Sequence, residues 1–279
     1  MGKNPLRYVL VSCLAMVFSA AAPSAGAAPA AELWERWTAF DATSPLTVDH
    51  QAWDRFLKSY VVEATGGVNR LSYARVTGQD RQALAGYIER LGAVAVGRLS
   101  RGEQLAMWIN LYNALTVKVV LDHFPVDSIR NIDISPGLFA DGPWGRTLIE
   151  IEGEAVSLDD IEHRIVRPIW KDPRIHYALN CAALGCPNLL PGAFSAANTE
   201  ALLEAAARMF VNDPRGVGFD DGRLIVSSLY VWYAGDFGGS DKAIIAHLKR
   251  YAEPPLRAKL GAVEKIDDDY YDWTLNAAK

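Results

Sequence analysis

The feature that most constrains the fold is a long stretch at residues 102–124, in which apolar side chains occupy almost every face of a helix. It reads GEQLAMWINLYNALTVKVVLDHF. One apolar stripe at three- and four-residue spacing consists of Leu105, Trp108, Tyr112, Leu115 and Val119. A helix that is apolar on most sides is buried, so the other elements must pack around it. The stretch therefore predicts a globular domain with a central helix.

The same helix carries a polar stripe formed by Glu103, Asn110 and Asn113. Buried amides need hydrogen-bond partners, so this stripe either bonds nearby backbone or lines a binding site. Both interpretations stay open from the sequence. We take these three residues, with Trp108 beside them, as candidate binding residues.

The N-terminus has the pattern of an export signal. Lys3 and Arg7 precede an apolar run at residues 8–22, and Ala25 and Ala27 provide a small-x-small cleavage pattern. We expect residues 1–27 to be a signal peptide and the mature protein to be periplasmic or secreted. A lipoprotein signal ending at Cys13 is the alternative, although the apolar run continues past that cysteine. No later stretch is long and apolar enough to be expected to span a membrane.

Charge argues against a nucleic-acid partner. The chain has 28 basic and 33 acidic residues, and removal of residues 1–27 takes away two basic residues and no acidic ones. The remaining formal charge is −7, whereas nucleic-acid binding requires a basic surface. We expect no cofactor and no nucleic acid, and an unknown small molecule or peptide as substrate; the oligomeric state is left open.

The pattern of elements predicts an α+β fold, with many helices around a small, mostly antiparallel sheet. Helical periodicity occurs at residues 32–40, 50–61, 80–94, 157–168, 200–210, 229–237 and 240–252, and hairpin patterns occur at 147–158 and 216–228. No linker or repeat divides the chain, so we expect one domain. Residues 28–99 form its N-terminal helical layer, and residues 100–279 form the rest.

The region richest in potentially reactive side chains is RIHYALNCAALGCPNL, residues 174–189. Alternating apolar residues predict a half-buried strand at 174–180, and Asn180 would cap a short helix that begins at Cys181. A helix would hold the Cα atoms of Cys181 and Cys186 about 8 Å apart, beyond the roughly 7 Å that a disulfide spans. Because Gly185 allows the chain to bend, a disulfide between the two cysteines remains the alternative.

A cysteine at a helix N-terminus favours the thiolate, which makes Cys181 a candidate nucleophile with backbone N–H groups nearby to bind an oxyanion. Its candidate bases are His176 and His163, and Glu162 could orient the imidazole. The helix of residues 157–168 places His163 away from the apolar stripe, so it could equally be a solvent-exposed histidine. Likewise, His176 could be a hydrogen-bonded structural histidine. We group Asn180 with the binding residues.

Five stretches in this order resemble the domain of unknown function 547 family: EQLAMWINLYNAL, VSLDDIEHRIVRP, RIHYALNCAALGCPNL, IVSSLYVWYAGDF and YYDWTLN. The resemblance covers roughly residues 100–276. It implies that Trp108, Asn110, Glu162, His163, His176 and Cys181 occupy recurring family positions. It also implies that Cys181 has a role independent of Cys186, because plant members keep only the first cysteine. The family name implies no activity.

Three functions follow as hypotheses. The first is a cysteine-dependent hydrolase or acyl transferase with Cys181 as nucleophile, on a fold distantly like papain or transglutaminase. The second is a non-catalytic envelope protein that binds a ligand or partner, with Cys181 and Cys186 as a local disulfide. The third is a metal site of His163, His176 and Cys181, although their spacing matches no standard short motif.

Overall fold

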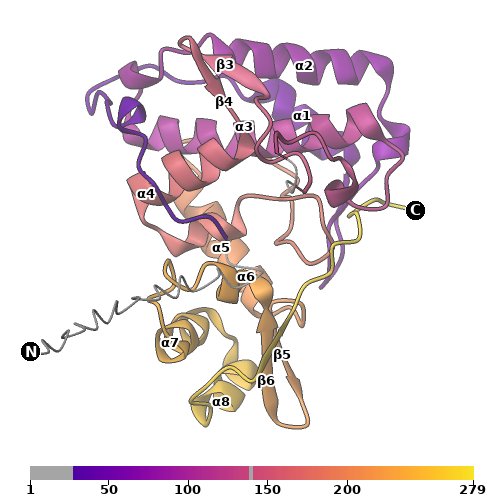
Figure 1. Cartoon of the computed structure of the whole chain (residues 1–279), viewed down its shortest axis with the longest axis vertical. Coiled ribbons are helices and arrows are strands. Elements are labelled where there is room, and N and C mark those ends of the chain that lie inside the picture. Colours follow the sequence, from indigo (N-terminus) through magenta and orange to yellow (C-terminus); the bar gives the residue numbers. More distant parts are fainter. Residues whose placement is uncertain (1–27, 138–140) are drawn as a thin grey trace, which may run out of the picture.

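The computed structural model describes residues 28–137 and 141–279 (Figure 1). The expected signal peptide and Cys13 therefore lie outside the described residues. The helices are α1 (Gln51–Tyr60), α2 (Gly78–Gly92), α3 (Arg101–His123), α4 (Arg167–Trp170), α5 (Thr199–Val211), α6 (Ser228–Trp232), α7 (Asp241–Tyr251) and α8 (Pro254–Gly261). The strands are β1 (Val61–Val62), β2 (Arg70–Leu71), β3 (Ile149–Ile151), β4 (Glu154–Val156), β5 (Val217–Asp220), β6 (Arg223–Ser227) and β7 (Asp268–Tyr270).

Helix α3 is the centre of the larger hydrophobic core, as its sequence predicts. It is buried along most of its length, and α1, α2, α4 and the β3–β4 hairpin lie in the same part of the molecule (Figure 1). Its first turn is capped by Ser100, whose hydroxyl accepts a hydrogen bond from the backbone N–H of Glu103. Burial on all sides, rather than one amphipathic face, fixes this helix in place.

A second core fills the other end of the molecule, where α7, α8 and the β5–β6 hairpin lie (Figure 1). Its largest buried side chains include Tyr177, Phe210 and Tyr230. Strand β6 pairs antiparallel with β5 and parallel with β7, and β1–β2 and β3–β4 are separate antiparallel pairs. The predicted α+β class, rich in helix with small and mostly antiparallel sheets, is therefore confirmed.

Two local predictions were wrong. Residues 174–180 form no strand; they contain a 3-10 helix, Pro173–Tyr177. The backbone N–H of Arg174 donates to the Asp172 side chain and Pro173 begins the helix, which favours a helical turn. The alternation of apolar and polar residues did not distinguish a buried face from an exposed one, because the side chains of residues 175–180 are all buried. Similarly, the helix expected at residues 32–40 is reduced to a 3-10 turn, Glu35–Trp37.

The helix expected to begin at Cys181 is also absent, since residues 181–190 form irregular chain. The Asn180 side chain accepts a hydrogen bond from the N–H of Ala182 at 3.0 Å, a local turn that competes with helix formation. Ala182 then adopts a left-handed conformation with φ of 59°. We call residues 178–190 the thiol loop. A helix N-terminus consequently does not act on Cys181.

The segment SLDDIEHRIV is helical as predicted, but much of it is wound as a π-helix, Asp160–Val166, which continues into α4. A capping box starts the segment, because Ser157 and Asp160 exchange side-chain and backbone hydrogen bonds at 3.0 and 3.1 Å. Pro168 does not end the helix, since it lies in the first turn of α4, where a missing N–H is tolerated. A π-helical turn of this kind is frequent at functional sites.

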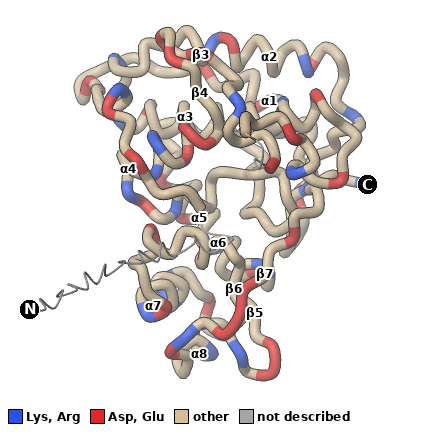
Figure 2. The backbone as a smooth tube through the Cα atoms, in the orientation of Figure 1, with Lys and Arg blue, Asp and Glu red and all other residues tan. Residues whose placement is uncertain are grey.

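After β7, the chain runs along the thiol loop toward α1, where the C-terminus lies (Figure 1). The backbone N–H groups of Leu184 and Gly185 donate to Thr274 and Asp272, and Asn276 donates back to Ala182. In Figure 2, basic and acidic residues are interspersed over the helices, and an acidic stretch marks β7. No helix in the described part of the chain is long and apolar enough to cross a membrane.

Candidate functional site

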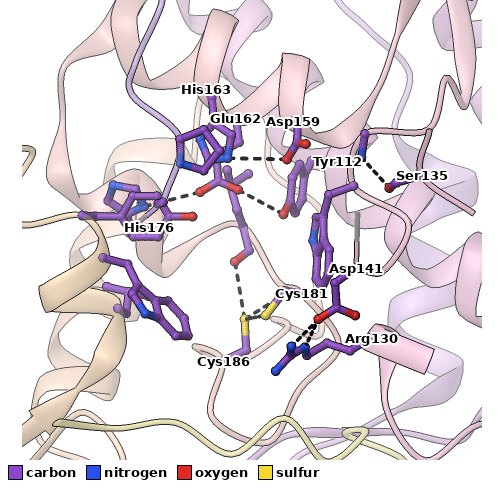
Figure 3. A pocket seen from close by; sticks show the side chains of 18 of the residues that line it. Tyr112, Arg130, Ser135, Asp141, Asp159, Glu162, His163, His176, Cys181 and Cys186 are labelled. Carbon is purple, nitrogen blue, oxygen red and sulfur yellow. Dashed lines mark hydrogen bonds and ion pairs between the residues drawn. The ribbon is translucent and has the colours of Figure 1, made fainter. Parts of the chain in front are cut away.

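A cavity of about 750 Å³ is the centre of the site (Figure 3). Its wall comes from α3, residues 130–136 and 141–145, the π-helix, the 3-10 helix Pro173–Tyr177, the thiol loop, α6 with Tyr233, and the C-terminal segment after β7. The polar and thiol side chains on this wall include all four catalytic candidates and are Arg130, Ser135, Asp141, Asp159, Glu162, His163, His176, Cys181 and Cys186. Aromatic side chains from the same wall are Tyr112, Trp144, Trp232, Tyr233, Tyr271 and Trp273.

Glu162 is a buried carboxylate at the back of this cavity. Its Oε2 accepts a hydrogen bond from the Tyr112 hydroxyl at 3.1 Å, and its Oε1 lies 3.7 Å from His176 Nδ1. Burial alone would raise the pKa of Glu162, but His163 and His176, when they are protonated at acid pH, lower it to about 2. Glu162 is therefore ionised at neutral pH and presents a fixed negative charge.

His163 is held as a neutral hydrogen-bond donor. Arg167 Nη1 donates to His163 Nδ1 at 2.8 Å, and because a guanidinium has only N–H groups, the proton of the ring must be on Nε2. That Nε2 lies 3.6 Å from Asp159 Oδ1. Burial lowers the pKa of His163, although Glu162 opposes this effect. His163 is 6% exposed, so the alternative of a solvent-exposed histidine does not hold.

Asp159 is a carboxyl group on this wall whose pKa is raised toward neutral pH. Burial raises its pKa to about 6, and the nearby carboxylates of Glu162 and Asp160 add to this effect. Its neighbour Glu162, three residues further along the helical segment, is shifted in the opposite direction. Paired carboxyl groups with opposite shifts are a common arrangement for acid–base chemistry.

His176 is engaged by carboxylates at both ring nitrogens. Its Nε2 lies 2.7 Å from Asp236 Oδ2, and Arg167 Nε donates to the same oxygen at 2.6 Å. Burial opposes ionisation of Asp236, but hydrogen bonds from His176 and Arg167 hold its pKa below the usual range. The ring of Tyr233 packs on the imidazole with centroids 3.9 Å apart. His176 is fixed in orientation by this set of contacts.

Cys181 and Cys186 are free thiols that contact each other (Figure 3). Cys181 Sγ donates to Cys186 Sγ at 3.0 Å, and the backbone N–H of Cys181 donates to the same sulfur at 3.0 Å. The Tyr271 hydroxyl lies 2.9 Å from Cys181 Sγ. Burial opposes ionisation of Cys186, yet the hydrogen bonds from Cys181 lower its pKa. The negative charge of a singly ionised pair is therefore held at Cys186.

The expected cysteine–histidine dyad is not formed. Among the described residues, neither His163 nor His176 makes a hydrogen bond to Cys181, because each imidazole is bound to Arg167 or a carboxylate. The four catalytic candidates line one cavity, but the thiol is not hydrogen-bonded to either histidine. Its partners are Cys186 and Tyr271 instead.

The thiol loop is clamped from three sides. Asn113 on α3 donates to the carbonyl of Ala178 at 2.9 Å and accepts from the N–H of Asn180 at 2.8 Å. Arg215 Nη1 donates to the carbonyls of Leu184 and Cys186 at 2.8 and 2.7 Å. On the third side, a Cβ at Gly185 would lie only 2.7 Å from the backbone nitrogen of Asp272, so glycine is needed for this close approach.

The five residues expected to bind a ligand lie outside the cavity wall, and the geometry gives them positioning roles. Trp108 is fully buried and packs edge-on against Trp37. Asn110 exchanges two hydrogen bonds with the backbone of Phe194, and Glu103 accepts from the N–H of Val48. Asn113 and Asn180 hold the thiol loop. Of the two interpretations of the polar stripe on α3, the structure therefore agrees with the one in which its side chains hydrogen-bond to nearby backbone.

A metal site of His163, His176 and Cys181 has no support from the geometry. Within residues 28–137 and 141–279, no three His, Cys, Asp or Glu side chains are grouped so that they could hold a metal ion. The two imidazoles already have close partners other than Cys181. The third hypothesis is therefore not pursued.

Sequence reasoning missed Asp159, Arg167, Asp236 and Tyr271 as site residues. Asp236 and Tyr271 lie in two of the stretches that carry the family resemblance, but their partners are 60 and 90 residues away in the chain. In both stretches an acidic residue lies next to an aromatic one, and this was the only sequence signal that could have marked Asp236 and Tyr271 as site residues.

Residues 96–211 match the family described as "Protein of unknown function, DUF547". This range begins before α3 and ends with α5, so it contains the catalytic candidates but excludes α6 and the C-terminal segment that complete the cavity. No curated protein and no solved structure matches the chain.

Proposed function

We propose that this chain, which residues 96–211 assign to the DUF547 family, is a cysteine-dependent acyl hydrolase or transferase with Cys181 as its nucleophile. The single observation that carries the proposal is the location of the Cys181 thiol. Its side chain lines the same cavity as the ionised Glu162 and the titratable Asp159. A thiol near groups with shifted pKa values in a cavity is a candidate catalytic centre.

Activation of the thiol uses Cys186 in place of an imidazole. The hydrogen bond to Cys186 and burial raise the pKa of Cys181, so its proton must be removed before it can react. The Cys186 thiolate, whose sulfur is 3.0 Å away, takes this proton, and the more exposed Cys181 sulfur becomes the thiolate. This sulfur attacks the carbonyl carbon of an ester or amide, a C–S bond forms, and the π electrons of the carbonyl move to its oxygen. Tyr271, whose hydroxyl lies 2.9 Å from the sulfur, can donate a hydrogen bond to that oxygen.

Collapse of this intermediate expels the alkoxide or amine, which takes a proton from a cavity-lining acid. The Asp159 carboxyl suits this role, because its pKa is raised to about 6 and it can both give and accept a proton near neutral pH. The ionised Asp159 then removes a proton from water or an acceptor amine that attacks the thioester. His163 Nε2–H is a fixed donor that can orient the substrate.

We also propose that the protein is exported. The support is the pattern of residues 1–27, which combines two basic residues, an apolar run and a small-x-small cleavage pattern. Expression of the full-length chain in a bacterium, followed by fractionation and intact mass measurement, tests this directly. We expect a periplasmic or secreted protein that begins at Ala28; an unprocessed cytoplasmic protein would contradict export.

The catalytic proposal is tested with p-nitrophenyl acetate as the acyl donor. The protein is quenched in acid, digested with trypsin and analysed by mass spectrometry. The tryptic peptide Ile175–Arg208 carries both thiols and no internal basic residue. We expect a single acetyl group on Cys181, its absence from Cys181→Ala, and slower loss of the group in Asp159→Asn.

Two results would overturn the proposal. One is acetylation that is equal in the wild-type protein and in Cys181→Ala, and the other is a wild-type protein that reacts no faster at Cys181 than the urea-unfolded chain does. Glu35→Gln is a matched control for the loss of a carboxylate, because Glu35 lies outside the cavity wall. It should leave both acetylation and release unchanged.

A further inference from the structure

The Cys181–Cys186 pair has a geometry that suits a second reaction. The two sulfurs are 3.0 Å apart as thiols, whereas a disulfide bond is about 2.05 Å long, so they need to approach by about 1 Å. Both lie in irregular chain and neither belongs to a rigid helix or strand. Oxidation of this pair is therefore geometrically accessible within the folded protein.

The two thiols differ in access. Cys181 is partly exposed on the cavity wall, whereas Cys186 is only 3% exposed. An incoming disulfide consequently meets Cys181 first. Cys186 is placed behind it, close enough to attack a mixed disulfide formed on Cys181.

The surroundings of Cys186 favour the reverse reaction as well. Its sulfur accepts the backbone N–H of Cys181 at 3.0 Å, and Arg215 binds its carbonyl at 2.7 Å. Groups that stabilise a thiolate make it a better leaving group and stabilise the reduced form of a dithiol couple. A disulfide in this position should therefore be easily reduced, unlike a structural disulfide.

From these contacts we infer that Cys181 and Cys186 form a reversible dithiol–disulfide couple that exchanges with small or protein disulfides entering the cavity. The Cys186 thiolate takes the proton of Cys181, and Cys181 Sγ attacks one sulfur of the disulfide, forms a mixed disulfide and releases the first thiolate, which takes the proton back from Cys186. Cys186 Sγ then attacks Cys181 Sγ and releases the second. Overall, two cysteine thiols and one external disulfide give one internal disulfide and two external thiols.

This inference depends on the thiol pair and not on the acyl chemistry proposed above. If both reactions occur, they compete for one sulfur, because a disulfide occupies the nucleophile. Oxidation would then switch off acyl transfer. The redox chemistry is measured on the thiols themselves, so it can succeed or fail whether or not Cys181 forms a thioester.

The test uses the purified protein with mixtures of oxidised and reduced glutathione at fixed total concentration. Remaining thiols are trapped with N-ethylmaleimide, and the peptide Ile175–Arg208 is analysed by mass spectrometry. We expect peptides with either two maleimide groups or none, and the latter should be lighter than the reduced peptide by two hydrogen atoms. Excess reduced glutathione should restore both thiols without unfolding.

Cysteine variants identify the order of attack. Cys186→Ser should accumulate a stable glutathione adduct on Cys181, because the second attack is lost. Cys181→Ser should react more slowly than Cys186→Ser, because Cys186 is buried. The wild-type titration needs no substitution, so a variant that folds poorly leaves the main test intact.

Three outcomes would overturn the inference. The first is a wild-type peptide that retains one glutathione and one maleimide at every ratio, since Cys186 would then not resolve the adduct. The second is oxidation that only links separate molecules. The third is an internal disulfide that excess reduced glutathione opens only after the protein is unfolded.

Discussion

Asn113→Ala should separate positioning of the thiol loop from general stability. The Asn113 side chain is 3% exposed and makes two hydrogen bonds to the loop, at 2.9 Å to the carbonyl of Ala178 and at 2.8 Å from the N–H of Asn180. Alanine leaves both backbone groups buried without partners. Each unpaired group costs about 1–3 kcal/mol, so we expect a loss of about 2–6 kcal/mol in the free energy of unfolding.

The chain contains a matched control on the same helix. Asn110 is fully buried and makes the same two kinds of bond with Phe194, at 2.8 and 3.0 Å, in a segment outside the cavity wall. Asn110→Ala should therefore destabilise the protein by a similar amount. Because its partner is remote from the thiols, their chemistry should remain that of the wild-type protein.

Two measurements decide the matter: urea unfolding for stability, and the rate of alkylation of Cys181 by iodoacetamide in the folded protein. Both variants should unfold at lower urea concentration, but only Asn113→Ala should change the alkylation rate and the yield of the internal disulfide. If the two variants have the same thiol behaviour, the clamp from α3 does not position the pair. A stability loss in Asn110→Ala alone would also refute the reasoning.

The remaining predictions concern charge and close packing. The pKa of Glu162 is lowered to about 2, so its ionisation stabilises the fold increasingly as pH rises from about 2 to the unfolded pKa of 4.5. Glu162→Gln should therefore lower the free energy of unfolding near pH 5. Urea unfolding should show this difference disappearing as pH falls from about 4.5 to 2, and a constant difference would contradict it. For Asp159, a pKa raised to about 6 means that stability is lost as pH rises from about 4 to 6. Because this side chain is 42% exposed, Asp159→Asn should gain at most about 1 kcal/mol in the same assay, and this gain should grow between about pH 4 and 6 and be complete above pH 6. A Cβ in Gly185→Ala would meet Asp272 N at 2.7 Å and Tyr271 Cγ at 3.0 Å, so we expect a loss of about 1–3 kcal/mol and an altered alkylation rate at Cys181. Gly86→Ala is the control: it lies within α2, its nearest contact is the flexible Arg90 at 3.7 Å, and it should gain about 0.5–1 kcal/mol without affecting Cys181.

Local patterns predicted the elements whose formation depends on their own residues. The burial of α3 followed from apolar side chains on almost every face, and helical periodicity at residues 157–168 predicted the helical segment that contains the π-helix. The pattern failed at residues 174–180, where alternation indicated a strand. There the Asp172 cap and Pro173 favour a 3-10 turn. Because the chain is buried on both sides, alternating polarity does not indicate a half-buried strand.

The sequence indicated several residues that line the cavity, but it did not indicate their hydrogen-bond partners. Glu162, His163, His176 and Cys181 line one cavity, and His163 is buried there, although solvent exposure was the alternative for it. Their hydrogen-bond partners could not be deduced, since a pattern of residues does not specify which distant segment packs beside it. The papain-like or transglutaminase-like relationship remains a prediction without a matching solved structure.

By itself, the sequence determined a helix-rich α+β domain built around one buried helix, because helix periodicity and capping are local properties of the chain. Only the tertiary structure decided the chemistry of the thiols. Close packing of the C-terminal segment against Gly185 brings Tyr271 to Cys181 across 90 residues, and a left-handed residue at Ala182 turns Cys186 back onto Cys181. These contacts depend on which backbones pack together, and a hydrogen bond of about 3 Å forms only once that packing is complete.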